Sequence, residues 1–186
     1  MPSGDSSAKR HTPMVMTDLD IALRLVIITA LSGLIGLERE YHGKPAGLRT
    51  NIMVGLGSTL MTIAGVKALD LFGGVASNID PTRIAGQIIT GIGFIGAGAI
   101  LRPSDNKNQS VVIGLTTAAT LWVVSGLGIA VGMGMFLEAI ITTALVFFTF
   151  LLLGRMVNYI REHARIYNPH HTQHDDPEEV PSNRHQ

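Results

Sequence analysis

The sequence predicts an all-α polytopic membrane protein: a bundle of five transmembrane helices with glycine-rich helix packing. Hydrophobic residues make up 46% of the 186 residues and charged residues only 15%, whereas soluble domains typically have ~25% charged residues. Mean hydropathy is +0.33. The chain contains 21 glycines, well above the usual share of ~7%. Low charge together with abundant glycine is typical of packed membrane helices.

Five apolar runs produce this composition, and each is close to the ~20 residues that a bilayer-spanning helix needs. Their approximate bounds are 21–37, 52–71, 84–101, 111–131 and 133–157. A soluble helical bundle is the alternative, but five such runs in succession could not all be shielded from water. We therefore expect a disordered N-terminal segment at 1–17, a membrane domain at 18–160 and a polar cytoplasmic tail at 161–186.

The first run combines a small-residue face with a charge near its start. Ser32, Gly33 and Gly36 share one helical face, and Arg24 lies one turn inside the run. We expect Arg24 to anchor the helix at the interface, where the preceding aspartates could pair with it. The charged loop at 38–50 is either a solvated turn or a set of arginine–carboxylate pairs across the helix ends.

The second run is apolar up to Asp70. The third run contains most of the residues that indicate how the helices pack. Small residues on one face of the third run predict close approach of a neighbouring helix; they are Gly86, Thr90, Gly93 and Ala97. Gln87 lies about one turn inside and needs a hydrogen-bond partner, which we expect near Thr117 or Arg49. The glycines at 91–96 match G-x-G-x-x-G, but no strand precedes them, so helix packing is preferred to a nucleotide site.

The fourth run carries three threonines, which usually bond the carbonyl four residues earlier. Trp122 lies in mid-span, so we expect it to pack between helices. Glycines at 126–134 predict a tight hairpin into the fifth run. Glu138 lies about one turn inside that run, and an acid within a membrane span is a functional candidate.

Basic residues predict the orientation. More of them follow the first, third and fifth runs than lie on the opposite side, where Lys9, Arg10, Lys67 and Arg83 are found. The positive-inside rule then places the N-terminus outside and the C-terminus in the cytoplasm. In the tail, His170, His171 and His174 raise the question of a metal site, but flanking prolines favour a disordered segment.

Composition and motifs also exclude several functions. The formal net charge of +0 argues against a nucleic-acid partner. The absence of cysteine excludes thiolate zinc sites, iron–sulfur clusters and cysteine nucleophiles. No catalytic constellation is recognisable, so an enzyme is not expected. We expect no cofactor, with Mg²⁺ as a possible ligand or substrate only, and the sequence does not define a metal site.

Four glycine-containing motifs follow one another along the chain: GLERE at 36–40, AGLRT at 46–50, RIAGQIITGIGFIGAG at 83–98 and GLTTAATLW at 114–122. In this combination and order they make the chain resemble the MgtC/SapB family of bacterial membrane proteins. The match covers roughly 19–159. Many relatives continue into a soluble ACT-like domain, and the short polar tail at 161–186 makes this chain look like the transmembrane-only branch.

The resemblance implies a five-helix protein of the bacterial plasma membrane that is linked to Mg²⁺ homeostasis and to growth at low Mg²⁺. It also marks candidate functional residues at the positions that match the family motifs. They are Glu38, Arg39, Gly47, Arg49, Thr50, Arg83, Gln87, Gly91, Gly93, Gly96, Gly98, Thr117, Thr120 and Trp122.

Two functions fit these features. The first is a regulator whose small-residue faces dock a helix of another copy or of another membrane protein within the bilayer. The second is a Mg²⁺ transporter or permeation unit that works as an oligomer. Because Mg²⁺ prefers oxygen ligands, the candidate outer contacts of such a transporter are Asp70, Asn78, Asp80 and Glu138.

Overall fold

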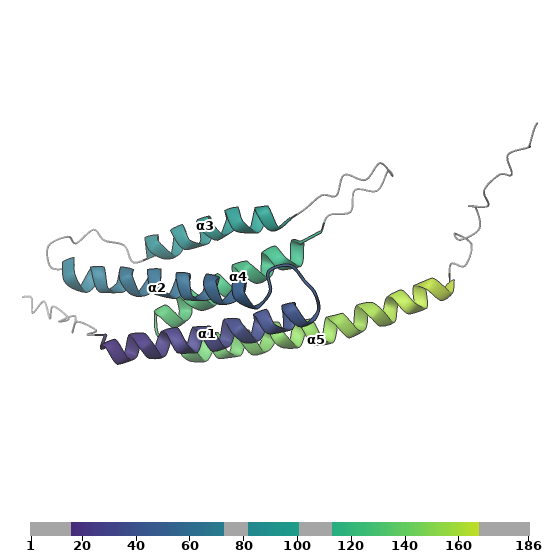
Figure 1. The fold of residues 1–186 in the computed structure, drawn as a ribbon, viewed down its shortest axis with the longest axis horizontal. Coiled ribbons are helices and arrows are strands. Elements are labelled where there is room, and N and C mark those ends of the chain that lie inside the picture. Colours follow the sequence, from purple (N-terminus) through teal and green to yellow (C-terminus); the bar gives the residue numbers. More distant parts are fainter. Residues whose placement is uncertain (1–15, 73–81, 101–112, 168–186) are drawn as a thin grey trace, which may run out of the picture. The chain divides into compact units, whose positions relative to one another are not determined.

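The computed structural model describes residues 16–72, 82–100 and 113–167, and these ranges contain five helices (Figure 1). The helices are α1 Asp18–Tyr41, α2 Leu48–Phe72, α3 Thr82–Ala99, α4 Leu115–Gly132 and α5 Phe136–Tyr167. The all-α prediction is confirmed, and each predicted run coincides with one helix. The helix α5 continues past residue 160, where we expected the tail to begin.

The chain divides into two compact units, Met1–Phe147 and Phe148–Gln186. The first unit holds α1 to α4 and the start of α5, and the second holds the rest of α5. Within the first unit, α2 packs against both α1 and α4. The helix α3 packs mainly on α4 and touches α2 much less. The apolar core of this unit includes Ile28, Ile35, Ile63, Leu121, Val124 and Val131.

Local sequence explains the ends of several helices. Thr17 begins α1 with a capping box, because its hydroxyl accepts from the Asp20 amide at 3.2 Å and the Asp20 carboxylate accepts from the Thr17 amide at 3.1 Å. Gly134, with a φ of +87°, forms the turn between α4 and α5. The predicted tight hairpin is therefore confirmed.

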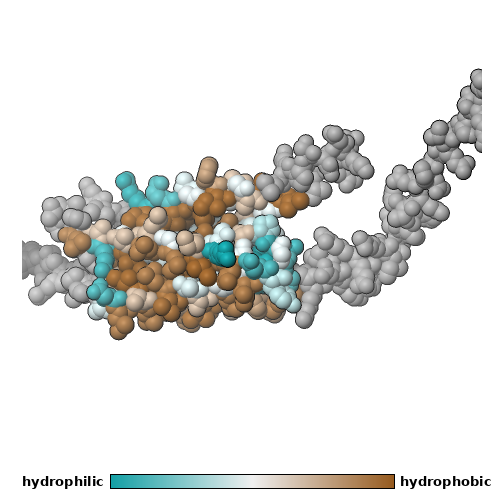
Figure 2. All heavy atoms as spheres, viewed as in Figure 1, coloured by the Kyte–Doolittle hydropathy of each residue, from teal (hydrophilic) through white to brown (hydrophobic). Residues whose placement is uncertain are grey.

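Three described helices are long and apolar enough to cross a membrane: α1, the Leu48–Ala68 part of α2, and α4. The apolar stretch of α5, Phe136–Leu152, is shorter. The helix α3 is not among these three, and its 18 residues include Arg83 and Gln87. Figure 2 shows hydrophobic side chains over the middle of the visible face and hydrophilic ones gathered toward its two ends.

Small residues pack α1, α2 and α4 closely together, including the predicted face of α1, whereas the predicted face of α3 does not pack within the chain. A Cβ added to Gly55 of α2 would lie 2.9 Å from the Ser32 hydroxyl of α1, and one added to Gly128 of α4 would lie 2.8 Å from the Gly55 carbonyl. By contrast, added Cβ atoms at Gly86 and Gly93 of α3 would meet nothing within 4 Å. The small-residue face predicted to pack against a neighbour points away from the bundle.

Candidate functional site

Polar motif residues meet where α1 ends and α4 begins. Arg39 is only 5% exposed, and its Nη2 donates to the Thr117 hydroxyl at 3.2 Å. Beside it on α1, the Glu38 side chain is 9% exposed and contacts the His42 ring 3.0 Å away through Oε1. The other oxygen, Oε2, is buried without a hydrogen-bond partner. Two of the four motifs therefore meet through a buried arginine.

The connection between α1 and α2 is held by its own motif residues. The Glu40 carboxylate accepts from the Leu48 amide at 2.8 Å and so caps the first turn of α2. The Asn51 side-chain amide donates to the carbonyls of Ala46 and Gly47 at 2.6 and 2.8 Å. Gly47 leaves room for the Glu40 carboxylate, which a Cβ would strike. Gly47 therefore has a structural reason to be glycine.

A second buried arginine lies at the other end of the bundle. Arg24 of α1 is 8% exposed, and its Nη1 donates to the Gly132 carbonyl at the end of α4. Its guanidinium also lies over the Phe136 ring, 5.7 Å from the centroid. We expected Arg24 to snorkel as an interfacial anchor or to pair with aspartate. In the structure its guanidinium caps α4, because the last carbonyls of a helix lack partners within it.

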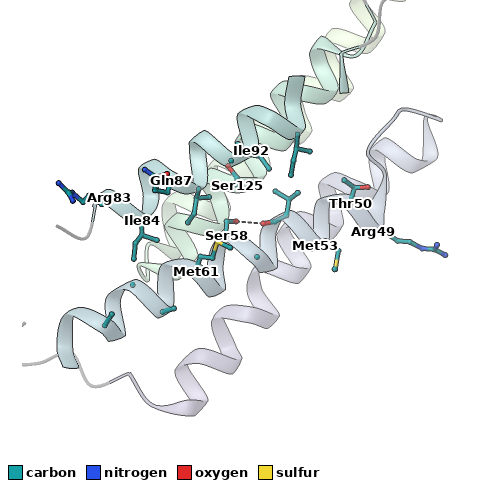
Figure 3. Close-up of a pocket in the computed structure, with 18 residues that line it drawn as sticks. Arg49, Thr50, Met53, Ser58, Met61, Arg83, Ile84, Gln87, Ile92 and Ser125 are labelled. Atoms are coloured by element: carbon teal, nitrogen blue, oxygen red, sulfur yellow. Dashed lines mark hydrogen bonds between the residues drawn. The ribbon is translucent and has the colours of Figure 1, made fainter. Parts of the chain in front are cut away.

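A large groove opens between α2 and α3 (Figure 3). It has a volume of about 1180 Å³ and an almost wholly apolar wall, with Ser125 of α4 reaching it as well. Arg49 and Arg83 lie at opposite ends of the groove in the close-up. Gln87 and Gly91 also line it, whereas Gly93 does not. The groove is thus bounded by residues of two family motifs.

The structure brings some predicted residues together and separates others. Arg39 and Thr117 meet, and Thr120 bonds its own helix at the Thr116 carbonyl, 2.8 Å away, as expected. The expected bond from Gln87 to Thr117 or Arg49 is wrong: Gln87 is exposed and lies near Arg83. Since α3 runs antiparallel to α2 and α4, Gln87 and those two residues are at opposite ends.

Other predicted residues lie on surfaces. Trp122 is 54% exposed, so the prediction that it packs between helices is wrong. Thr50 and Arg49 are exposed at the mouth of the groove. On α3, Gly98 is open, while Gly96 packs on Ala118 with an added Cβ 3.6 Å away.

Most of the candidate outer cation contacts lie outside the residues that the structure describes. Asn78, Asp80 and the side chain of Asp70 lie outside the described residues, as does the histidine-containing tail. Glu138 is exposed in the first turn of α5. Among the described side chains, no group of three or more His, Asp or Glu could hold a metal ion.

Sequence reasoning missed several buried polar residues that organise the bundle. Asn51 is fully buried, and Thr59 of α2 donates to the Gly128 carbonyl of α4 at 3.0 Å. Their signal was available: a polar side chain within an apolar run needs a partner inside the protein. Which partner it finds depends on how the helices pack, and the packing arrangement cannot be read from a single sequence.

Long apolar helices joined by buried polar contacts define this chain as a polytopic helical membrane protein. Its family follows from comparison: the chain belongs to the MgtC family, whose model matches residues 25–159. No solved structure matches the chain significantly.

Named relatives support this assignment. The chain is 46% identical over 123 residues to SapB of Bacillus subtilis, which covers 66% of this chain and 51% of SapB. It is 37% identical over 140 residues to MgtC of Salmonella typhimurium, covering 75% and 55%. YhiD of Escherichia coli K12, named as a candidate magnesium transporter, is 45% identical over 123 residues, covering 63% and 53%. The chain therefore spans about half the length of these relatives.

Proposed function

We propose that this protein is a regulator embedded in the bacterial inner membrane, where it serves Mg²⁺ homeostasis and growth at low Mg²⁺ by docking a helix of another membrane protein. One observation carries the proposal: the outward face of α3. All four of its small residues are exposed, and no neighbouring atom fills the space beside Gly86 or Gly93. This face, formed by Gly86, Thr90, Gly93 and Ala97, is called the docking face below.

The chemistry of the docking face suits a transmembrane helix. Small side chains let two helix backbones approach closely, and such contacts drive association where lipid supplies no hydrophobic force. The Thr90 hydroxyl already donates to the Gly86 carbonyl at 2.9 Å, so the face presents no unpaired hydroxyl proton to lipid. A partner helix would gain van der Waals contact without having to satisfy a polar group.

The buried charges favour a regulator over a permeation path. Arg24 and Arg39 are both buried in the bundle, one near each end of α1. Each positive charge repels a divalent cation, and this repulsion is strongest where water is excluded. An oligomeric Mg²⁺ transporter is the second candidate, and the name of the Escherichia coli relative is the observation in its favour.

Growth and transport measurements together test the proposal. We expect Gly93→Leu to lose complementation of a strain that needs this protein at low Mg²⁺, because leucine fills the docking face. Gly126→Leu is the matched control, since an added Cβ there also meets nothing within 4 Å. Equal complementation by the two variants would contradict docking.

Purified protein in liposomes separates the two candidates. A regulator should give no Mg²⁺ influx above that of empty liposomes when an entrapped fluorescent indicator is used. Influx that Gln87→Leu abolishes would instead support the transporter. Helical content and membrane insertion are measured on the same liposomes. These measurements exclude a folding failure as the reason for an absence of Mg²⁺ influx.

A further inference from the structure

We propose that the groove between α2 and α3 binds the acyl chains of phospholipids, whose phosphates are held by Arg49 in one leaflet and by Arg83 in the other. The groove is on the opposite side of α3 from the docking face, because its residues Ile84, Gln87 and Gly91 are out of phase with Gly93. This inference therefore stands or falls independently of the proposed partner helix.

The shape of the groove fits a chain-like apolar ligand. The two helices meet where the Ile84 side chain packs against Gly65, and a Cβ on Gly65 would displace the end of that side chain. From Arg49 to Gly65, α2 rises roughly 24 Å at ~1.5 Å per residue, close to the ~30 Å of a bilayer hydrocarbon core. The volume of about 1180 Å³ exceeds the ~300–1,000 Å³ of pockets for drug-sized ligands.

The interior of the groove offers almost only apolar contact. Its two serines are satisfied by their own helices: Ser58 donates to the Val54 carbonyl at 2.7 Å, as Figure 3 shows, and Ser125 donates to the Trp122 carbonyl at 2.9 Å. Flexible methionines, Met53 and Met61, adapt to an irregular neighbour. Mobile acyl chains suit such a wall better than a rigid helix does, since the contact at Ile84 interrupts it.

The charges at the ends of the groove complement phosphates. Arg49 and Arg83 are exposed, and none of the described residues that line the groove is acidic. Guanidinium groups form charge-assisted, often bidentate, bonds to phosphate oxygens. Gln87 lies one turn from Arg83 on the same face, which places an amide donor beside that guanidinium. An anionic lipid such as phosphatidylglycerol is therefore preferred to a zwitterionic one.

Filling the groove is the first test. Gly91→Leu and Gly57→Leu place side chains into it from α3 and α2, and an added Cβ at either site meets nothing within 4 Å. We expect the protein released from phosphatidylglycerol-containing membranes to retain lipid in native mass spectrometry, and each variant to retain about tenfold less. Gly93→Leu, on the other face of α3, should retain as much as wild type.

The arginines are tested by lipid preference. The Arg49→Gln and Arg83→Gln double variant should still bind lipid but lose about tenfold of its preference for phosphatidylglycerol over phosphatidylcholine. Unchanged retention in both groove-filling variants, or unchanged preference in the double variant, would overturn the proposal. Helical content and elution volume, measured on each variant, distinguish a filled groove from a misfolded protein.

A crosslink identifies the occupant directly. Because the chain has no cysteine, Met53→Cys can carry a single benzophenone at the groove wall. Irradiation in membranes should yield a phospholipid adduct in the mass spectrum. A crosslinked dimer or an adduct to another protein would overturn the lipid assignment. Loss of complementation by Gly93→Leu without any change in lipid retention would show that the two proposals are separate.

Discussion

Arg24 and Arg39 show how single buried side chains join helices at opposite ends of the bundle. Arg39 meets the Thr117 hydroxyl at the start of α4, and Arg24 meets the Gly132 carbonyl at its end. Burying a guanidinium is costly unless its donors find acceptors, and each of these arginines donates to an acceptor on α4. The two arginines therefore fix the position of α4 along α1.

Removing the Arg24 guanidinium should destabilise the bundle. Arg24→Gln loses the charged bond to the Gly132 carbonyl and the contact with Phe136, and hydrogen bonds of this class contribute about 1.5–3 kcal/mol. Unfolding by dodecyl sulfate, followed by circular dichroism, should begin at a lower detergent fraction. Lys67→Gln removes a charge elsewhere as the control. Equal unfolding midpoints for these two variants would contradict the capping role of Arg24.

Residue types in the sequence indicated some of the polar side chains that organise the bundle, but not the partners that these side chains contact. Arg24 and Gln87 both lie one turn inside apolar runs. Arg24 was expected to anchor at the interface, and Gln87 was expected to find a hydrogen-bond partner. Arg24 is buried against α4, whereas Gln87 faces the groove. Helical spacing assigns residues to one face of their own helix, while the choice of partner depends on the arrangement of all the helices.

At the scale of the element, α2 and α4 are joined through small residues. A Cβ on Gly128 would collide with Ser58 and lie 2.8 Å from the Gly55 carbonyl, which is backbone and cannot move aside. Thr59 adds its hydrogen bond to the Gly128 carbonyl. Glycine at 128 therefore sets the distance between the two helices.

Glycine-to-alanine substitutions should distinguish the effect of close helix packing on stability from the effect of helix propensity. Gly128→Ala forces α2 and α4 apart and should destabilise the bundle by about 1–3 kcal/mol. Gly126→Ala, two residues earlier on an open face, should be neutral or stabilising by up to ~1 kcal/mol. Thermal melts of the two purified variants in one detergent give the comparison. A lower melting temperature for Gly126→Ala than for Gly128→Ala would contradict the packing argument.

The helix α3 marks the limit of inference from periodicity. Its small residues were correctly placed on one face, since a 3.6-residue period determines that alone. Close approach of a neighbour from the same chain was expected there, yet α3 packs through Ile92 and Gly96 instead. Amphipathic patterning does not distinguish a face that packs within one chain from a face left for another molecule.

For the whole molecule, five helices and their order could be predicted because long apolar runs have few alternatives in a membrane. The prediction for the α4–α5 hairpin also succeeded, because Gly134 supplies a positive φ where the chain reverses. The groove could not be predicted. It exists because α3 packs on α4 more than on α2, and that difference arises from contacts between distant residues.

The orientation of the bundle leads to the last prediction. Arg39 and Arg24 join the two ends of α1 to opposite ends of α4, so Lys44, after α1, and Met135, after α4, lie at opposite ends of the bundle. More arginine and lysine lie on the Lys44 side, which the positive-inside rule assigns to the cytoplasm. In a chain without cysteine, Met135→Cys should react with an impermeant maleimide on intact cells, and Lys44→Cys only after permeabilisation. The reverse pattern would place Arg49 in the outer leaflet and Arg83 in the inner one, while leaving the groove itself unchanged.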